Sequence, residues 1–452
     1  MDAVESALQN QLLALLADRG VANSLALQAA LGRSQPTVSR LLTQVGAQLA
    51  VLGAGQRTRY ALPQTLLGQP ARQALHAVGD DGRITHWGTL TFVRGDRVHV
   101  HAEGIDLLVQ GRLPWFLAPL RGEGFIGRQQ ARELAAWGLP GNPEQWSLEQ
   151  TLFAALRLPD APGGLVLGDG LGNGLGNVLG DVPGDGLAST PAHAMRSNAA
   201  HTSPDWDALA RATSGNLPAG SSAGGEQAKF LTRDAEGTPL LVKFSPIRNS
   251  PFGQRWHDLL HVEALALTVL AEHGVPVASS RVVETARRTY LVSQRFDRHG
   301  PSGRSHVVPL HAVHEAFVHG PLQHWAATCR ALAQQRRLPA DAADQAQALL
   351  HFGRLIGNTD MHFGNLSLRV AWADIARGRF TLAPVYDMLP MRWRPDHHSG
   401  ELGLLPFTPE PIDMQSAARP VALRFWQRAA RTQALSAGFR ELAATMAQRL
   451  TG

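Results

Sequence analysis

Gly357-Asn-Thr-Asp-Met-His-Phe-Gly-Asn-Leu-Ser367, with Val385-Tyr-Asp-Met-Leu389 further along the chain, is the part of this sequence that decides its fold. Asp360 and Asn365 lie five positions apart in a glycine-containing loop, and Asp387 follows an apolar, strand-like run. An Asp and an Asn at this spacing also occur in ordinary capped turns. With Asp387 added, the pattern indicates a site built from oxygen ligands.

The two lysines of the chain give a second signal. They are Lys229 and Lys243, in a sequence with 42 lysine and arginine residues. Because arginine serves at the other basic positions, we infer that these two positions need a compact ammonium, as a phosphate site does. Lys243 lies in the apolar run 238–244, and Lys229 closes the glycine-bearing segment 221–229. Several phosphotransferases hold ATP phosphates in this way. Two lysines left by chance on a solvated surface are the alternative.

Protein kinases combine these features for physical reasons. In that interpretation Asp360 orients the acceptor hydroxyl, and Asn365 and Asp387 hold Mg²⁺, a hard cation that prefers oxygen ligands. Glu263 lies on the helix predicted after the Lys243 strand. It either pairs with Lys243 or is an ordinary exposed helix residue. The predicted cofactors are therefore ATP and Mg²⁺.

Length and composition set the class of protein. The 452 residues are 44% hydrophobic and 17% charged, which favours a multidomain globular protein. A net charge of +5 permits an acidic partner such as DNA. The single cysteine, Cys329, excludes an intramolecular disulfide. Because we find neither a secretory signal nor an apolar stretch of about eighteen residues, we expect a cytoplasmic protein without a membrane span.

Residues 1–65 are predicted to form a winged helix-turn-helix domain, with helices from Gln11, from Ser24 as a cap, and from Gln35, and a hairpin over 49–62. In such a domain the third helix enters the major groove of DNA, and the hairpin, or wing, meets phosphate. A three-helix protein-interaction domain is the alternative. The predicted DNA contacts are Gln35, Thr37, Ser39, Arg40, Gln44, Arg57 and Arg59.

The middle of the chain divides into a mixed subdomain at 82–160 and a glycine-rich stretch at 161–205. His99 and His101 fall on one face of a predicted strand, but the nearby sequence offers no acidic or cysteine partner for a metal. The stretch 161–205 is predicted to be a mobile linker or loop, because burial cannot offset the entropy of ordering it. Its glycine and aspartate repeats lack the regular period of calcium-binding repeats.

Residues 206–450 are predicted to form a two-lobed, kinase-like unit. The small β-rich lobe spans about 206–297 and the large α-rich lobe about 298–450. At their junction, Gln294 and Phe296 would face the adenine ring. The predicted fold class is therefore α+β and multidomain.

Together these motifs resemble the HipA family of serine/threonine kinase toxins, in the YjjJ-type branch with a fused winged helix. The resemblance covers 206 to about 445 well and 85–155 more weakly. It implies that Asp360 and Lys243 are catalytic and that Asn365 and Asp387 bind the metal. The residues it assigns to ATP binding are Gly224, Gly225, Lys229, Lys243, Glu263, Gln294 and Phe296.

The resemblance also implies partners and self-regulation. The substrate would be a protein of translation such as an aminoacyl-tRNA synthetase, and its phosphorylation would stop growth. Ser222, with Ser221 as its neighbour, would be the autophosphorylation site, because a phosphate there competes with ATP phosphates. The family toxin relies on a separate DNA-binding antitoxin, whereas this chain carries its own DNA-binding domain. A separate antitoxin and a homodimer stay open.

Two other functions remain open from the sequence. The first is a DNA-binding regulator whose kinase-like part is a sensor or a dimerisation platform, which the winged helix and the basic balance favour. The second is a metal nuclease, although the histidine spacings match no known ligand pattern. Its candidate ligands are His311, His314, His362, His397 and His398.

Overall fold

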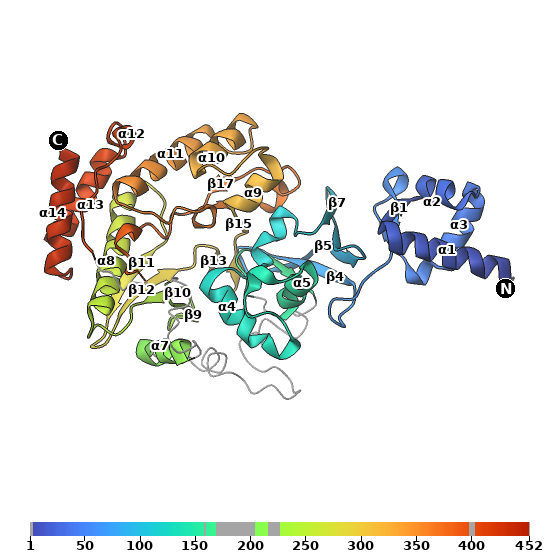
Figure 1. The fold of residues 1–452 in the computed structure, drawn as a ribbon, viewed down its shortest axis with the longest axis horizontal. Helices are drawn as coiled ribbons and strands as arrows, with labels where there is room; N and C mark the ends of the chain where they lie inside the picture. Colours follow the sequence, from blue (N-terminus) through green and yellow to red (C-terminus); the bar gives the residue numbers. More distant parts are fainter. Residues whose placement is uncertain (1–2, 158–159, 169–203, 216–226, 397–402, 452) are drawn as a thin grey trace.

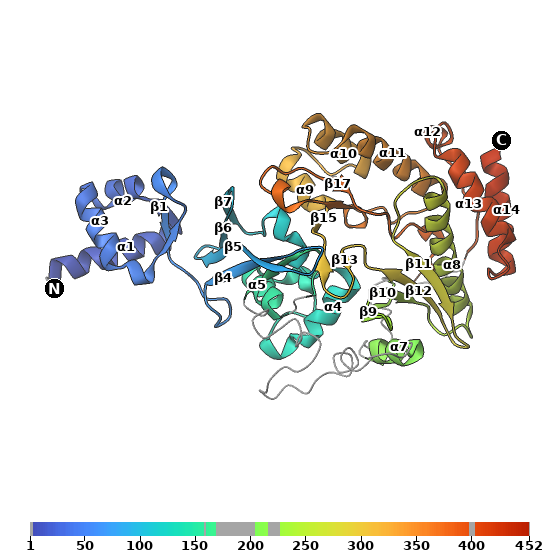
Figure 2. The ribbon, with the colours of Figure 1, turned by 180° about the vertical axis from the view of Figure 1, so that it is seen from behind.

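The computed structural model describes residues 3–157, 160–168, 204–215, 227–396 and 403–451. The chain forms an N-terminal domain at one end, a middle domain, and a two-lobed unit that ends in α13 and α14 (Figure 1). The view from behind shows the same order along the long axis (Figure 2). No helix in the described ranges is long and apolar enough to cross a membrane. The predicted class, α+β and multidomain, is confirmed.

The N-terminal domain packs three helices against a three-stranded antiparallel sheet of order β1-β3-β2. Its core is formed by apolar residues of all three helices, such as Leu16, Leu27 and Leu41. The predicted hairpin over 49–62 is present, because β2 pairs with β3. The elements are α1 (Ala3–Arg19), β1 (Val21–Asn23), α2 (Ser24–Leu31), α3 (Gln35–Gln44), β2 (Ala50–Leu52) and β3 (Arg59–Ala61).

The cap of α2 differs from the prediction. Asn23, not Ser24, has the extended backbone of a cap, and its side chain accepts a hydrogen bond from the Ala26 N–H at 2.8 Å. Ser24 is the first helical residue. Both side chains are good caps, and the β1 strand that ends at Asn23 decides between them, because it keeps that residue extended. Gly32, with φ of 61°, ends the helix as predicted.

The middle domain is a five-stranded antiparallel sheet of order β7-β6-β5-β4-β8, with α4 (Gly124–Glu133) and α5 (Leu148–Arg157) beside it. It starts before residue 82, the predicted boundary. It also takes its last strand from the predicted linker. The strands are β4 (Arg72–Val78), β5 (Ile84–Val93), β6 (Arg97–Ala102), β7 (Ile105–Gln110) and β8 (Leu165–Leu167).

Strand β8 therefore corrects the prediction that 161–205 is a linker from its first residue. Its three residues are all buried, and they pair with β4. Three consecutive apolar residues between glycines are typical of a strand covered on both faces. The glycine content of the whole stretch obscured this short signal.

The small lobe is an antiparallel sheet of order β11-β12-β10-β9. Its strands are β9 (Lys229–Arg233), β10 (Pro239–Phe244), β11 (Ser280–Glu284) and β12 (Thr289–Gln294). Helix α7 (Trp206–Gly215) closes a separate small core with these strands, and α8 (Pro251–Glu272) contacts β11 and β12.

The large lobe is mostly helical, and one continuous core joins it to α8 and to the middle domain. Its helices are α9 (Leu310–Phe317), α10 (Trp325–Gln334), α11 (Ala340–Leu355), α12 (Pro411–Met414), α13 (Arg419–Arg431) and α14 (Ala437–Thr451). Its short strands are β13 (Arg298–His299), β14 (Gly303–Arg304), β15 (Val307–Pro309), β16 (Ser367–Arg369) and β17 (Thr381–Leu382). The predicted order of a β-rich part before an α-rich part is present.

Buried polar groups fasten β8 to the junction of the lobes. Asp297 accepts the Gly163 N–H at 2.9 Å, and His306 Nδ1 accepts the Gly164 N–H at 3.3 Å. Gly163 has φ of 82°, and a Cβ there would lie 2.9 Å from His306 Nδ1, so no other residue suits this approach. We call Asp297, His306 and the two glycine amides the tether.

Two arginines surround the tether carboxylate. Asp297 pairs with Arg295 at 3.0 Å and with Arg298 at 2.6 Å, and all three side chains are buried. The same arginines reach Asp160 of the middle domain at 2.9 and 3.0 Å. Each buried arginine thus has carboxylate partners, which is the condition for burying ions without a large loss of stability.

Candidate active site

Strand β10 places Lys243 inside the small lobe. Lys243 is 4% exposed, and its backbone lies opposite Lys229 of β9, so the two lysines of the chain are neighbours across two strands. The apolar residues Leu240, Val242 and Phe244 hold the strand in its core. A lysine this deeply buried needs a charged partner.

Helix α8 provides the first partner. The helix begins at a serine cap, Ser250, followed by Pro251. Glu263 lies on its buried face, 2% exposed, and its Oε1 accepts a hydrogen bond from Lys243 Nζ at 2.6 Å. The sequence left open whether Glu263 pairs with Lys243 or is an exposed helix residue, and the pair is what forms. Glu263 Oε2 is buried without a hydrogen-bond partner in the described residues.

Asp387 provides the second partner. Its Oδ1 lies 2.6 Å from Lys243 Nζ. The strand-like run before it is held against the small lobe by a parallel bridge between Val277 and Val385. Asp387 then takes φ of 53°, a left-handed conformation that is uncommon outside glycine. We call Lys243, Glu263 and Asp387 the lysine cluster.

The loop after α11 carries Asp360 and Asn365. The Asp360 N–H donates to the Asn358 side chain at 3.0 Å, and Asn365 Nδ2 donates to the Asp360 carbonyl at 2.8 Å. Asn358 also reaches the Asp387 carbonyl at 3.4 Å, which ties the loop to the lysine cluster. These hydrogen bonds hold Asp360 and Asn365 in place within the loop. Because Asn365 Nδ2 is used in the hydrogen bond to the Asp360 carbonyl, the side-chain oxygen of Asn365 is the atom that can coordinate a cation.

The charges of the lysine cluster stabilise one another. Burial disfavours the ammonium of Lys243, but the carboxylates of Asp387 and Glu263 outweigh it and raise its pKa. Burial opposes ionisation of Asp387, and the charges of Lys243 and Lys229 overcome it, so the pKa of Asp387 is lowered. Burial raises the pKa of Glu263 against the effect of Lys243. The Lys243 ammonium and the Asp387 carboxylate both line the cavity.

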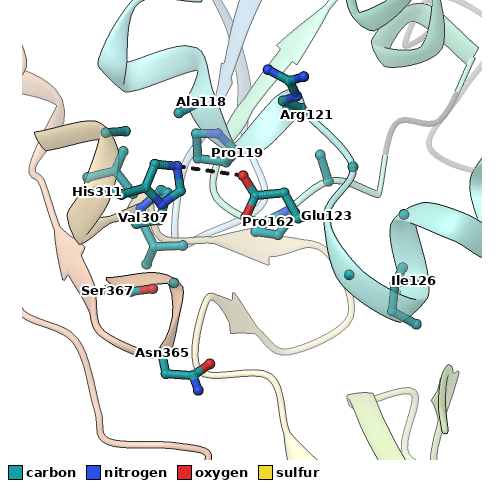
Figure 3. A pocket seen from close by; sticks show the side chains of 18 of the residues that line it. Ala118, Pro119, Arg121, Glu123, Ile126, Pro162, Val307, His311, Asn365 and Ser367 are labelled. Atoms are coloured by element: carbon teal, nitrogen blue, oxygen red, sulfur yellow. Dashed lines mark ion pairs between the residues drawn. The ribbon is translucent and has the colours of Figure 1, made fainter. Parts of the chain in front are cut away.

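One cavity of about 1340 Å³ joins all these groups. Lys229, Lys243, Asp360, Asn365 and Asp387 line it. Gln294 and Phe296, the predicted adenine contacts, line it as well, and Phe296 stacks on Tyr386 with ring centroids 5.4 Å apart. The middle domain and α9 complete its wall (Figure 3). Figure 3 labels Asn365 and Ser367 in this pocket, together with residues of the middle domain such as Ala118, Glu123 and Ile126.

The donor atoms in the cavity suit a magnesium ion. A carboxylate from Asp387 and an amide oxygen from Asn365 are oxygen ligands, which Mg²⁺ prefers. Asp387 already lies against one cation, the Lys243 ammonium, so its carboxylate attracts positive charge in this position.

Three of the predicted site residues, Ser222, Gly224 and Gly225, lie outside the described residues, as does Ser221. Lys229, which closes the same segment, is described and faces the cavity.

The predicted DNA contacts lie far from this cavity, in the N-terminal domain (Figure 1). Gln35, Ser39, Arg40, Gln44 and Arg57 are exposed, and Thr37 is half-buried. Arg59 differs from the prediction, because its guanidinium lies 3.5 Å from Asp106 of the middle domain instead of facing outward.

The structure bears on both predictions that involved histidines as metal ligands. His99 bonds to Asp106 at 2.7 Å, an acidic partner that the sequence near His99 did not reveal. Of the described residues, the group of histidines and acids close enough to hold a metal is His257, His261 and Glu284. It includes none of the described nuclease candidates, His311, His314 and His362, whereas His397 and His398 lie outside the described residues.

Two features of the site were missed by sequence reasoning. The tether and its arginines join residues more than a hundred positions apart, which no local pattern indicates. The contribution of Glu123 to the cavity was also missed. Its signal would have been an acidic residue next to the glycines of 122–124.

Comparison with known proteins decides the family. Residues 221–451 match the HipA-like C-terminal domain, and residues 69–172 match the middle domain of YjjJ-like toxins. Toxin YjjJ of Escherichia coli strain K12 is 32% identical over 434 residues, which is 92% of each chain. The chain belongs to the HipA-like toxins of the YjjJ type. The match of 69–172 also shows that a YjjJ-type middle domain includes β4 and β8.

A solved HipA structure has the same fold. The HipA chain of Shewanella oneidensis MR-1, determined with HipB and its operator DNA, aligns with this YjjJ-type toxin at a TM-score of 0.50. The alignment covers 84% of this chain and 95% of that chain, at 16% identity. At this identity the likeness concerns the fold alone.

Proposed function

We propose that this toxin is a protein serine/threonine kinase that depends on ATP and Mg²⁺. The observation that carries the proposal is the Lys243 ammonium, 2.6 Å from both Glu263 and Asp387, in one cavity with Asp360 and Asn365. A buried cation between two carboxylates costs free energy of desolvation, so a structural role alone is a poor reason to keep it. A phosphotransferase needs this arrangement to orient phosphate.

Each residue has a distinct role in the proposal. Lys243, oriented by Glu263, contacts phosphate oxygens, and Asp360 accepts the proton of the attacking hydroxyl. Asp387 and Asn365 hold the magnesium ion, which when bound neutralises phosphate charge. Lys229 adds positive charge on the neighbouring strand.

The nucleotide would lie in the small-lobe end of the cavity. Gln294 and Phe296 line that end, and the Phe296 carbonyl accepts a hydrogen bond from Arg369 at 3.0 Å, which fixes the junction. The proposed phosphate loop includes Gly224 and Gly225. Autophosphorylation of Ser222 or Ser221 would add negative charge where ATP phosphates bind and would switch the kinase off.

The biological target in this proposal is a protein of translation, such as an aminoacyl-tRNA synthetase, in the cytoplasm. Its phosphorylation would explain growth inhibition by a toxin. A HipA relative was determined together with HipB, and we propose that this chain has an antitoxin or carries part of that role in its N-terminal domain.

The first experiment tests phosphotransfer. The purified full chain is incubated with labelled ATP and Mg²⁺ beside Asp360→Ala and Asp387→Asn, and the phosphate is mapped by mass. Asp18→Asn, an exposed residue of α1, is the matched control. We expect label in the wild type and the control and none in the two site variants. Label that persists in Asp360→Ala, or no label in a folded wild type, contradicts the proposal.

DNA binding is a second proposed function of the same chain. The exposed polar face of α3, with Gln35, Ser39, Arg40 and Gln44, favours it. The expected partner is operator DNA, and affinity should fall steeply as salt rises. Arg40→Ala should weaken binding to the operator by about 1–3 kcal/mol if it contacts a base. Operator binding without any phosphotransfer would instead favour a regulator whose kinase-like part is a sensor.

A further inference from the structure

The cavity is larger than a nucleotide site needs. Pockets for small ligands measure about 300–1,000 Å³, and this one measures about 1340 Å³. Its small-lobe end holds Lys243 and Gln294, whereas its other end is lined by the middle domain and α9. If the nucleotide occupies the first end, the acceptor hydroxyl has to reach Asp360 from the second. The middle domain is therefore the surface that the acceptor meets.

Two contacts between polar side chains cross this second end. Arg112 and Glu123 of the middle domain face Glu315 and His311 of α9, at 3.4 Å and 3.6 Å respectively. His311 and Glu315 lie four positions apart and so share one face of the helix. Both carboxylates are about half exposed, at 51% for Glu123 and 52% for Glu315. The opening between the middle domain and α9 thus presents charges that a ligand can reach.

The charged side chains at this end differ in their hydrogen-bond partners. Arg112 donates a hydrogen bond to Glu315, and Arg121 donates one to the Glu144 carbonyl at 3.1 Å. The partner of Glu123 in the described residues is His311, at a distance too long for a hydrogen bond. Figure 3 shows the Glu123 side chain inside the pocket and directed toward His311. Glu123 is therefore the carboxylate with the most capacity for a new cationic partner.

Glu123 also shares its cavity with the proposed catalytic residues. Glu123 lines the same cavity as Tyr386 and Asp360. Tyr386 precedes Asp387 and bonds to Ser367 at 2.8 Å and to the Gly364 carbonyl at 2.7 Å. A cation bound by Glu123 would therefore lie in the same cavity as the loop that carries Asp360.

We propose that Glu123 is a specificity-determining residue that binds a basic side chain of the acceptor protein, close to the phosphorylated serine or threonine. The acceptor is then an extended segment that passes between the middle domain and α9, over half-buried apolar residues such as Leu113 and Ala118. This inference rests on the proposed kinase activity and adds the chemistry of the acceptor. Electrostatic complementarity of this kind sets partner choice.

The test uses a library of peptides with a fixed serine or threonine and randomised flanking positions, phosphorylated by the full chain with labelled ATP and Mg²⁺. We compare the wild type with Glu123→Gln, which keeps the shape, and Glu123→Arg, which reverses the charge. Glu441→Gln, an exposed residue of α14, is the control. The wild type and the control should prefer arginine or lysine at one flanking position by about fivefold.

Glu123→Gln and Glu123→Arg test whether Glu123 causes this preference. Glu123→Gln should lose this preference, and Glu123→Arg should prefer aspartate or glutamate at the same position. The preference of the wild type should weaken at high salt, because exposed charges are screened. Peptides phosphorylated without a basic preference, or a preference unchanged in Glu123→Arg, would overturn the inference and leave the kinase proposal standing. No phosphate transfer to peptide or to the protein itself would overturn both.

Discussion

The lysine cluster and the tether are both buried groups of charge, yet they differ in what their aspartates face. In the lysine cluster one ammonium lies between two carboxylates, and Asp387 remains 26% exposed to the cavity. In the tether region Asp297, whose side chain is 7% exposed, is enclosed by Arg295 and Arg298, and the same arginines reach Asp160. A carboxylate that lines a cavity is suited to bind further charge, whereas a carboxylate enclosed by its own arginines is suited to fix domains.

The largest effect is expected from Asp387→Asn. The change removes the carboxylate that faces the cavity and leaves the Lys243–Glu263 pair, so the fold should persist while phosphotransfer falls by about a thousandfold or more. Phosphate incorporation and thermal unfolding, measured side by side, separate the two effects. If Asp387→Asn lowered the unfolding temperature as strongly as it lowered phosphotransfer, the lysine cluster would have a structural role like that of the tether.

Asp297→Asn should have the opposite profile. It removes the more buried of the two carboxylates that Arg295 and Arg298 share, and breaking a buried pair in this way costs about 3–5 kcal/mol of unfolding free energy. Urea unfolding measures the loss. ATP binding by the fraction that stays folded is the control for a purely structural role. An unchanged unfolding free energy would show that the ion pairs of Asp297 do not stabilise the fold.

His306 should make stability depend on pH. Burial lowers its pKa to about 4, against the hydrogen bond to the Phe116 carbonyl, so the folded protein holds the ring neutral. The ring of the unfolded chain gains a proton below about pH 6.5. Stability from this group is thus complete above pH 6.5 and is lost as the pH falls toward 4, by roughly 3 kcal/mol.

His306→Gln tests that expectation, because glutamine keeps one donor and one acceptor and does not titrate. Its unfolding free energy should vary less than that of the wild type between pH 6.5 and pH 4. Identical pH profiles for the two proteins would exclude His306 as the source.

Asp160→Asn should have the smallest effect. Asp160 meets the same arginines as Asp297, but its side chain is 45% exposed, so water replaces much of what the carboxylate provides. We expect a loss of about 1 kcal/mol or less in urea unfolding. A loss equal to that of Asp297→Asn would mean that exposure does not separate the two carboxylates.

The sequence predicted the site better than it predicted the links between domains. Lys243, Asp360, Asn365 and Asp387 stood out because their spacing and residue types are dictated by chemistry, and the structure brings all four to one cavity. Their catalytic roles stay predictions. The position of Glu263 required the angle of α8 against β10, which periodicity does not give.

The links were hidden for a different reason. Arg59, chosen as a wing residue for DNA, pairs with Asp106 of the middle domain. Arg295 and Arg298 flank Phe296, a predicted adenine contact, but one of their partners is Asp160 of the middle domain. Contacts between distant segments depend on how whole domains pack, and a single sequence holds no local pattern for them.

The tether also bears on the order in which the protein forms during synthesis. The core of the N-terminal domain lies within residues 8–62 and can form as soon as that segment emerges from the ribosome. Strand β8 is held by Asp297, which is 134 positions after Gly163. The growing chain should therefore present a finished N-terminal domain well before the cavity has its last wall, so any partner of that domain can engage the nascent toxin while its cleft is still incomplete.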